Sequence, residues 1–306
     1  MTVRGRFAPS PSGRMHLGNL LAALLAWLDV RSQGGVMVLR IEDLDPQRCS
    51  LDKAAQLVED LQWLGLDWDE GGLEPEYCQS RRWDHYEAAF RRLEELGLIY
   101  PCYCTRAERL AASAPHRSDG VVIYDGRCRR LSPQEREKLE STRRPAWRVE
   151  APEETVSFTD RIQGPFSQNL ARECGDFILR RSDGVYAYQL AVVVDDAAMG
   201  VTQVVRGSDL LDSTPRQLWL QEALGLPHPE YGHVPLLLAL DGRRLAKRDR
   251  DQELGELQSR YTAPELVGRL AHLAGLIPEP APVTPAELVP LFSWDKLPRA
   301  DQVMSL

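Results

Sequence analysis

The stretch Arg6-Phe7-Ala8-Pro9-Ser10-Pro11-Ser12-Gly13-Arg14-Met15-His16-Leu17-Gly18-Asn19 decides the fold of this 306-residue chain. It begins inside a strand-like run (residues 3–8), passes through a turn rich in proline, serine and glycine, and opens onto an apolar helix expected from Leu20 to about Arg31. A strand that enters a helix through such a loop points backbone N–H groups and the positive helix end at one place, which suits a phosphate. Gly18 lets a ligand approach the backbone, and His16 adds a donor. Taken alone, the last four residues also fit an ordinary loop with a surface histidine.

The segments that follow predict an α/β fold with a parallel sheet. Residues 36–41 form a short apolar strand, and residues 52–64 and 81–96 have helical spacing and are each closed by a glycine. Alternation of strands and helices is typical of parallel sheets. Glu42 and Asp43 follow the second strand, at the sheet edge where open α/β folds bind ligands.

The pattern of predicted secondary structure changes at Tyr100. Short strand-like pieces and turns replace long helices up to about Asp183, which indicates an inserted domain. The apolar run at residues 186–196 predicts a buried strand that resumes the sheet, followed by a strand at 201–206 and a helix at 214–224. Past Asp251 the chain predicts a small helical region and a loose tail.

Composition places the chain among soluble globular proteins. Its hydrophobic content of 43% and charged content of 27% are ordinary, and it contains neither a run of 18 apolar residues nor a signal-peptide pattern. We therefore expect a cytoplasmic protein with no membrane partner. A net charge of −8 argues against a surface that binds nucleic acid everywhere, but it leaves room for a local basic face.

A group of cysteines indicates a possible metal site. Cys102, Cys104 and Cys128 lie close together in the sequence, and in an intracellular chain such a group favours metal binding over disulfides. Zinc requires four ligands, so Tyr124, His116 or an unidentified residue would have to be the fourth. The spacing departs from Cys-x-x-Cys, and three buried thiols are an equal alternative.

Phosphate chemistry has two candidate locations. The chain contains neither a Gly-x-x-x-x-Gly-Lys-Ser/Thr loop nor a Gly-x-Gly-x-x-Gly loop, so ATP would have to bind at the first strand–helix turn. The basic run Arg243-Arg244-Leu245-Ala246-Lys247-Arg248 could neutralise charge on a leaving pyrophosphate, although such runs are often only solvated loops. Arg206, placed at a strand end, could pair with a carboxylate through two N–H groups.

In this order, the pieces resemble the class I aminoacyl-tRNA synthetases of the glutamyl/glutaminyl branch. Residues 6–13 with His16-Leu17-Gly18-Asn19 are similar to that branch's opening and "HIGH" signature, and Arg40-Ile41-Glu42-Asp43 is similar to its next strand end. Residues 182–202 resemble the second half of its active site, and residues 244–248 occupy the place of its "KMSKS" loop. The resemblance extends over about residues 3–250.

This resemblance implies a Rossmann-like domain split by an insertion, and attack of an amino acid carboxylate on the α-phosphorus of ATP, with magnesium, before transfer to RNA. It assigns catalytic roles to His16 and Lys247. The residues implied to bind glutamate are Arg6, Ala8, Ser10, Glu42, Tyr188 and Arg206; those implied to bind ATP are His16, Gly18, Asn19, Arg244, Leu245, Ala246, Lys247 and Arg248. Asn19 stands in place of the second histidine of the first signature; Arg244 and Ala246 replace the first lysine and the serine of the second.

The chain is shorter than a full glutamyl-tRNA synthetase, which continues into an anticodon-binding domain. A truncated form with Cys-x-Cys…Tyr-x-x-x-Cys resembles the glutamyl-queuosine tRNA(Asp) synthetases, which activate glutamate without tRNA and attach it to queuosine in the anticodon of tRNA(Asp). That resemblance implies one structural zinc ion held by Cys102, Cys104, Tyr124 and Cys128, and favours Tyr124 over His116.

The implied organisation has four parts. Residues 1–99 and 186–235 are the two halves of the catalytic domain, residues 100–185 are the inserted zinc-containing domain, and residues 236–306 hold the basic loop and a short helical region without an anticodon-binding domain. We expect a monomer whose partners are glutamate, ATP and queuosine-containing tRNA(Asp). The alternatives are a minimal glutamyl-tRNA synthetase, a nucleotidylyltransferase for a small molecule, and an inactive paralogue that only binds.

Overall fold

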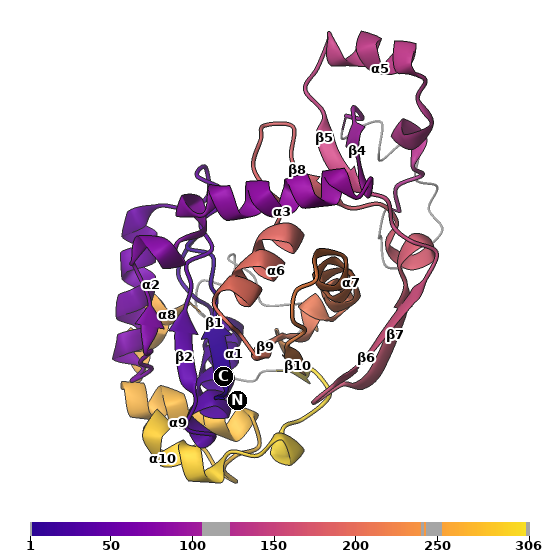
Figure 1. Ribbon diagram of the computed structural model, residues 1–306. Coiled ribbons are helices and arrows are strands. Elements are labelled where there is room, and N and C mark those ends of the chain that lie inside the picture. The colour runs from indigo at the N-terminus through magenta and orange to yellow at the C-terminus, as the bar shows by residue number, and fades with distance from the viewer. Residues whose placement is uncertain (1, 106–122, 240–241, 243–252, 304–306) are drawn as a thin grey trace.

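The computed structural model describes residues 2–105, 123–239, 242 and 253–303 (Figure 1). A five-stranded parallel sheet lies at its centre, in the order β10-β9-β1-β2-β3. Its strands are β1 (Arg4–Phe7), β2 (Val36–Leu39), β3 (Glu70–Gly71), β9 (Gln203–Gly207) and β10 (Glu230–Val234). Because the chain proceeds from β1 to β2 on one side and returns at β9 on the other, the strand order reverses between β1 and β9. Ligands of open α/β sheets bind at such a point.

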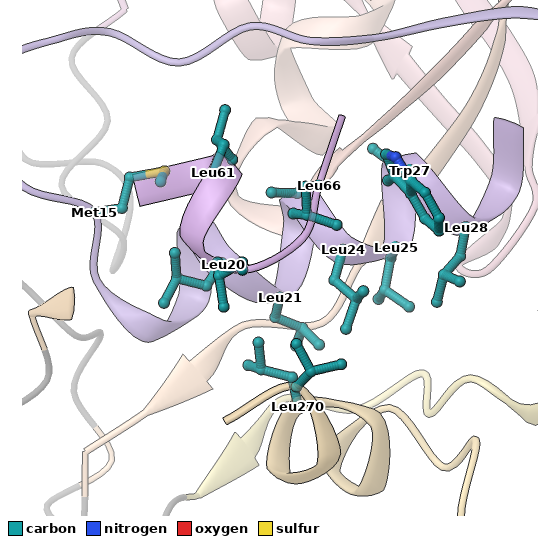
Figure 2. Packing of buried hydrophobic residues seen from close by; sticks show 14 of the residues in the cluster. Met15, Leu20, Leu21, Leu24, Leu25, Trp27, Leu28, Leu61, Leu66 and Leu270 are labelled. Atoms are coloured by element: carbon teal, nitrogen blue, oxygen red, sulfur yellow. The ribbon is translucent and has the colours of Figure 1, made fainter. Parts of the chain in front are cut away.

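Helix α1 (Leu17–Ser32) covers one face of this sheet. Its side chains are buried almost all round, which explains why its sequence is apolar on every side. Figure 2 shows the leucines of α1 between Leu61 and Leu66 on one side and Leu270 on the other. Leu61 belongs to α2 (Leu51–Trp63), and Leu270 belongs to α9 (Ala263–Leu273). Residues 3–8 and the first helix are thus confirmed, although the helix begins at Leu17, inside the quoted stretch.

The opposite face of the sheet is covered by a second group of helices. Alternate strand residues point to opposite faces, so Val205 packs with α1 whereas Val204 packs with Leu218 of α7 (Thr214–Leu224). Helix α7 packs in turn against α6 (Tyr188–Ala198) and α3 (Trp83–Glu95). The helices expected at 52–64, 81–96 and 214–224 and the strands expected at 36–41 and 201–206 are therefore confirmed.

The strand expected at residues 186–196 is wrong, because this run forms helix α6. Val192, Val193 and Val194 favour a strand locally, but all three are buried between neighbouring helices. A helix buried on every side has no polar face, so its sequence lacks the 3.6-residue period that distinguishes it from a buried strand. Tertiary packing decides the conformation here.

The residues between α3 and α6 form a small sheet, a helix and a hairpin. Strands β4 (Ile99–Cys102), β5 (Ala146–Val149) and β8 (Ile178–Arg180) pair antiparallel. Helix α5 (Pro133–Glu140) lies at the top of Figure 1, away from the central sheet. The hairpin of β6 (Thr155–Asp160) and β7 (Gly164–Asn169) reaches back to the central sheet. There the ring of Phe158 packs against Tyr231, with centroids 5.9 Å apart.

The C-terminal region is helical, as expected, but its tail is ordered. Helices α8 (Leu254–Arg260), α9 and α10 (Pro285–Leu288) pack near α1. Beyond them Trp294 Nε1 donates to Asp29 Oδ1 at 3.1 Å, Leu297 is buried, and β12 (Gln302–Val303) pairs with β11 (Leu237–Leu238). The loose tail expected from the sequence is therefore wrong for residues 294–303, because apolar side chains and strand pairing fix them.

Several short helical turns complete the described chain. They are Pro75–Tyr77, Gln79–Arg81, Arg127–Arg130, Leu170–Cys174, Ser208–Ser213, Val289–Leu291 and Trp294–Lys296. Within the described residues, no helix is both long enough and apolar enough to cross a membrane.

Candidate active site

A cleft of about 910 Å³ opens at the carboxyl ends of β1 and β9, where the strand order reverses. Every described residue that the sequence assigned to glutamate or ATP lines this cleft. They are Arg6, Ala8, Ser10, His16, Gly18, Asn19, Glu42, Tyr188 and Arg206. The resemblance therefore named residues that lie on one continuous surface although they come from distant parts of the chain.

The loop after β1 places the N-terminus of α1 at the cleft. His16 is the residue that precedes α1, and the side-chain oxygen of Asn19 accepts its backbone N–H at 3.2 Å. The first turn of α1 contains no acidic residue, so no side chain of that turn offsets the positive end of the helix dipole. A side chain on Gly18 would lie 3.2 Å from His16 Cε1, so glycine here also leaves space for the imidazole.

Arg206, from β9, is held by four hydrogen bonds. Its Nε donates to His233 Nε2 at 3.0 Å and its Nη1 to the Tyr188 hydroxyl at 3.2 Å. Its Nη2 donates to Thr214 Oγ1 at 2.8 Å and to the Leu210 carbonyl at 3.5 Å. Of the five N–H groups, one on Nη1 has no partner among the described residues. Pairing with a carboxylate through two N–H groups, considered from the sequence, would require Arg206 to release one of these partners.

Tyr188 reaches the cleft from a different element than expected. It is the first residue of α6 rather than a residue of a strand, and its hydroxyl meets Arg206. The N-terminus of a helix and the end of β9 thus place the two side chains together, so the wrong element at 186–196 did not displace the site residue.

A buried group of charges lies beneath the cleft. Arg40 is fully buried; its Nη1 donates to Asp196 Oδ1 at 2.6 Å and its Nη2 to Glu42 Oε1 at 3.2 Å. Arg6 Nε lies 3.4 Å from the same oxygen of Asp196. Asp196 therefore orients Arg6, and Arg40 orients Glu42. Arg6 and Glu42 line the cleft, and these buried contacts fix the positions of their side chains.

The two carboxyl groups in this cluster differ in pKa. Burial acts to raise the pKa of Asp196, but Arg40 and Arg6 outweigh it and hold that pKa below its usual value. Burial raises the pKa of Glu42 despite the opposing effect of the same two arginines. A cationic group bound beside Glu42 would favour its charged form.

A neighbouring carboxylate of α6 anchors the helices around this cluster. Asp195 accepts hydrogen bonds from Gln79, Arg82 and Tyr86 at 2.8, 2.6 and 2.9 Å. Sequence reasoning gave no role to Arg40, Asp195 or Asp196. Two acidic residues after an apolar run, and one arginine at the end of an apolar strand, are the signals that could have indicated a buried ion cluster.

The basic run at residues 243–248, with Arg244, Leu245, Ala246, Lys247 and Arg248, lies outside the described residues. The described segments on either side of it both reach the cleft. Leu237 lines the cleft before the run, and after it Leu254 N–H donates to the Met15 carbonyl at 2.9 Å. Glu253 forms a β-bridge with His16.

The cysteine group lies apart from the cleft, at the end of β4. The Sγ atoms of Cys102, Cys104 and Cys128 all lie within 4.8 Å of one another, and none forms a disulfide. The Tyr124 hydroxyl lies 3.5 Å from the sulfurs of Cys102 and Cys104. A hydrogen bond from the Cys128 thiol lowers the pKa of Cys102. His116, the other ligand considered, lies outside the described residues.

Most of the chain is similar to known tRNA synthetases. Residues 2–279 match the family of tRNA synthetases class I (E and Q), catalytic domain. Glutamyl-Q tRNA(Asp) synthetase of Symbiobacterium thermophilum is 53% identical over 96% of this chain and 94% of its own length. The corresponding protein of Nitratidesulfovibrio vulgaris is 51% identical over 97% of this chain and 94% of its own length. The chain belongs to the glutamyl-Q tRNA(Asp) synthetase family.

Solved structures of longer enzymes have a fold similar to that of this glutamyl-Q tRNA(Asp) synthetase family member. A glutamate-tRNA synthetase from Elizabethkingia anophelis is 29% identical, with a TM-score of 0.85, and the match covers 100% of this chain and 68% of that one. A glutamate tRNA ligase from Elizabethkingia meningosepticum, solved in complex with its amino acid, has a TM-score of 0.84 at 29% identity and is covered over 67% of its length. The α/β class I fold expected from the sequence is thereby confirmed.

Proposed function

We propose that this enzyme activates glutamate with ATP, without needing tRNA, and transfers the glutamate to queuosine in tRNA(Asp). The observation that carries this proposal is the cleft itself. Arg6, Glu42 and Arg206 line it, and so do His16, Gly18 and Asn19 at the N-terminus of α1. An amino acid with two carboxylates and a phosphate chain can therefore lie side by side there.

Glutamate fits the charges of the cleft. Two arginines, Arg6 and Arg206, supply N–H donors for its two carboxylates, and Glu42 supplies a negative charge for its ammonium group. Ala8, Ser10 and Tyr188 complete the walls. The α-carboxylate is already a nucleophile, so the reaction needs correct placement and neutralisation of charge rather than a strong general base.

ATP fits the part of the cleft that lies at the start of α1. The backbone N–H groups at the start of α1, with His16, Gly18 and Asn19, favour an anion there. We assign Lys247 and its neighbours Arg244, Leu245, Ala246 and Arg248 to the pyrophosphate as it leaves, with magnesium bound to ATP. The anchoring of Leu254 beside Met15 brings the segment after this run to the same end of the cleft.

The proposed activation of glutamate can be measured separately from transfer to tRNA. Glutamate should support exchange of labelled pyrophosphate into ATP in the absence of any tRNA. Glutamine should fail, because its amide lacks the negative charge that pairs with an arginine. Equal exchange with glutamine, or exchange that appears only after tRNA is added, would exclude the proposed activation step.

We also assign residues 100–185 to an inserted domain that contacts tRNA and holds zinc through Cys102, Cys104, Tyr124 and Cys128. The donor set fits zinc, since three thiols and one phenol oxygen can surround an ion and no carboxylate belongs to the cluster. The ion would hold the end of β4 against the turn Arg127–Arg130. Such an ion would be structural, because the cysteine group lies at the end of β4 and apart from the residues that line the cleft.

Purified protein should contain about one equivalent of zinc by elemental analysis. Cys128→Ser should lose most of it and unfold residues 100–185 at lower denaturant than the rest, because the metal-binding free energy is folding free energy. Cys174→Ser is the matched control, since this free thiol lies outside the cluster. Zinc well below one equivalent in the unaltered protein, prepared without chelators, would contradict the assignment.

A further inference from the structure

The tip of the β6–β7 hairpin contacts the central sheet through one buried carboxylate, Asp160. Its oxygens accept the backbone N–H groups of Ile162 and Gln163 at 2.9 Å and that of His233 at 3.1 Å. The second oxygen also lies 2.6 Å from His233 Nδ1. Asp160 is 2% exposed and His233 is fully buried, so water does not compete for these contacts. Asp160 therefore joins the hairpin to β10 through hydrogen bonds to the backbone and the ring of His233.

The contact on the other side of His233 fixes its tautomer. Arg206 Nε donates to His233 Nε2, and an arginine N–H can only donate. His233 Nε2 must then carry a lone pair, which places the proton on Nδ1, where it is donated to Asp160. Thr214 supports the same arrangement, because its Oγ1 accepts from Arg206 Nη2 at 2.8 Å and lies 3.2 Å from His233 Nε2.

The pKa shifts of the pair agree with this tautomer. Burial lowers the pKa of His233, although the hydrogen bond to Asp160 opposes it, so the imidazole is neutral near pH 7. Burial acts to raise the pKa of Asp160, but hydrogen bonds from His233 and Gln163 outweigh it and hold the pKa below its usual value. The dyad is thus a carboxylate beside a neutral imidazole.

We propose that Asp160 and His233 are positioning residues for the glutamate site: Asp160 keeps the proton of His233 on Nδ1, and Nε2 then holds Arg206 in the orientation that presents Nη1 to the cleft. This inference rests on the proposed role of Arg206 in binding glutamate. It connects the hairpin of the segment between α3 and α6 to the amino acid site, through residues 160, 206 and 233.

Asp160→Asn tests the tautomer with little change of shape. The amide oxygen can still accept the backbone N–H groups, but its NH₂ group donates to His233 Nδ1 and moves the imidazole proton to Nε2. Two N–H groups, on His233 Nε2 and Arg206 Nε, then face each other. We expect the KM for glutamate in pyrophosphate exchange to rise by about 10- to 100-fold, as for the loss of one hydrogen bond to a charged group, while the KM for ATP stays unchanged.

Ser157→Ala is the matched control on the same hairpin, because it removes only an exposed hydrogen bond between Ser157 and Ser167. It should leave both KM values unchanged. An unchanged KM for glutamate in Asp160→Asn, or a rise shared equally by ATP, would overturn the proposal.

The ¹⁵N spectrum of the His233 ring reads the tautomer without any activity. We expect protonated Nδ1 and unprotonated Nε2 in the unaltered protein, and the reverse in Asp160→Asn. A proton on Nε2 in the unaltered protein would also overturn the proposal. Because this readout needs no substrate, it separates failure of the dyad from failure of the proposed function, which would appear as absent exchange in the unaltered enzyme.

A second pair of variants covers the case in which Asp160→Asn does not fold. In His233→Gln the amide oxygen can take the place of Nε2 as acceptor for Arg206, whereas His233→Leu offers no acceptor. The glutamine variant should therefore have the lower KM for glutamate. Equal values in the two variants would contradict the proposed role of Nε2.

Discussion

Arg206→Ala should lower kcat/KM for glutamate in pyrophosphate exchange by about 30-fold or more and leave ATP binding intact. The change removes a guanidinium group that lines the cleft, and His233 and Tyr188 lose their hydrogen bonds to it. Loss of a buried, hydrogen-bonded charge at a binding site corresponds to about 2–5 kcal/mol, which is a factor of about 30 to several thousand. ATP binding, measured by protection against thermal unfolding, should change little because the phosphate end of the cleft is untouched.

Two further variants make this result specific. Arg206→Lys keeps the positive charge but cannot reach His233, Tyr188 and Thr214 together, so it should recover only a small part of the activity. Arg91→Ala removes an exposed arginine of α3 that pairs with Glu87 in its own helix, and it should leave exchange unchanged. Unchanged glutamate-dependent exchange in Arg206→Ala would refute the proposed amino acid site.

Asp196→Ala should destabilise the protein by about 3–5 kcal/mol, because it leaves Arg40 and Arg6 buried without their shared carboxylate. That is a large part of the stability of an ordinary domain, about 5–15 kcal/mol. Urea unfolding measures the change. Glutamate activation should fall as well, since Arg6 loses the contact that orients it.

Glu70→Ala is the matched control for this variant. It also removes a carboxylate partner of an arginine on the central sheet, Arg4, but Glu70 and Arg4 are both partly exposed to solvent. Such pairs contribute about 0–1 kcal/mol. Equal destabilisation in the two variants would contradict the account of the buried cluster.

The stability contributed by Asp196 should also depend on pH. Its pKa in the folded protein is held below the value of about 3.9 for an unfolded aspartate, so its contribution is present above that pH and is lost as the pH falls through the folded value. The difference between the unaltered protein and Asp196→Ala should therefore narrow as the pH is lowered below about 4.

The sequence predicts the boundaries of helices and strands well where the backbone chemistry of single residues determines them. The turn between β1 and α1 and the glycines that close α1, α2 and α3 mark element boundaries by backbone chemistry alone. Glu42 could be placed for a related reason, because it follows a strand at the edge where parallel sheets bind ligands. The resemblance to glutamyl-tRNA synthetases, and not strand position, assigned Arg6 and the other cleft residues.

The sequence fails where distant packing decides the outcome. Residues 188–198 have the β-branched residues and continuous apolarity of a strand, and only their burial between α3 and α7 makes them helical. The prolines near residue 280 suggest a loose tail, but Trp294 and Leu297 pack into the fold. Local propensity has no information about such partners.

The support beneath the site is hidden for the same reason. Asp160 and His233 are 73 residues apart, and Arg40 and Asp196 are 156 residues apart. No spacing rule joins such residues, since their contact depends on strand order and on the hairpin that returns to the sheet. The family resemblance named nine of the described residues that line the cleft, whereas the residues that orient Arg6, Glu42 and Arg206 were assigned no role.

The most direct test of the central claim uses labelled glutamate, ATP and magnesium with two bulk tRNA pools, one from cells that make queuosine and one from cells that do not. We predict label on tRNA(Asp) in the first pool and none in the second. Label at the 3′ end of tRNA(Glu) in both pools would contradict the account, because it would show a minimal charging enzyme whose acceptor is an ordinary tRNA end.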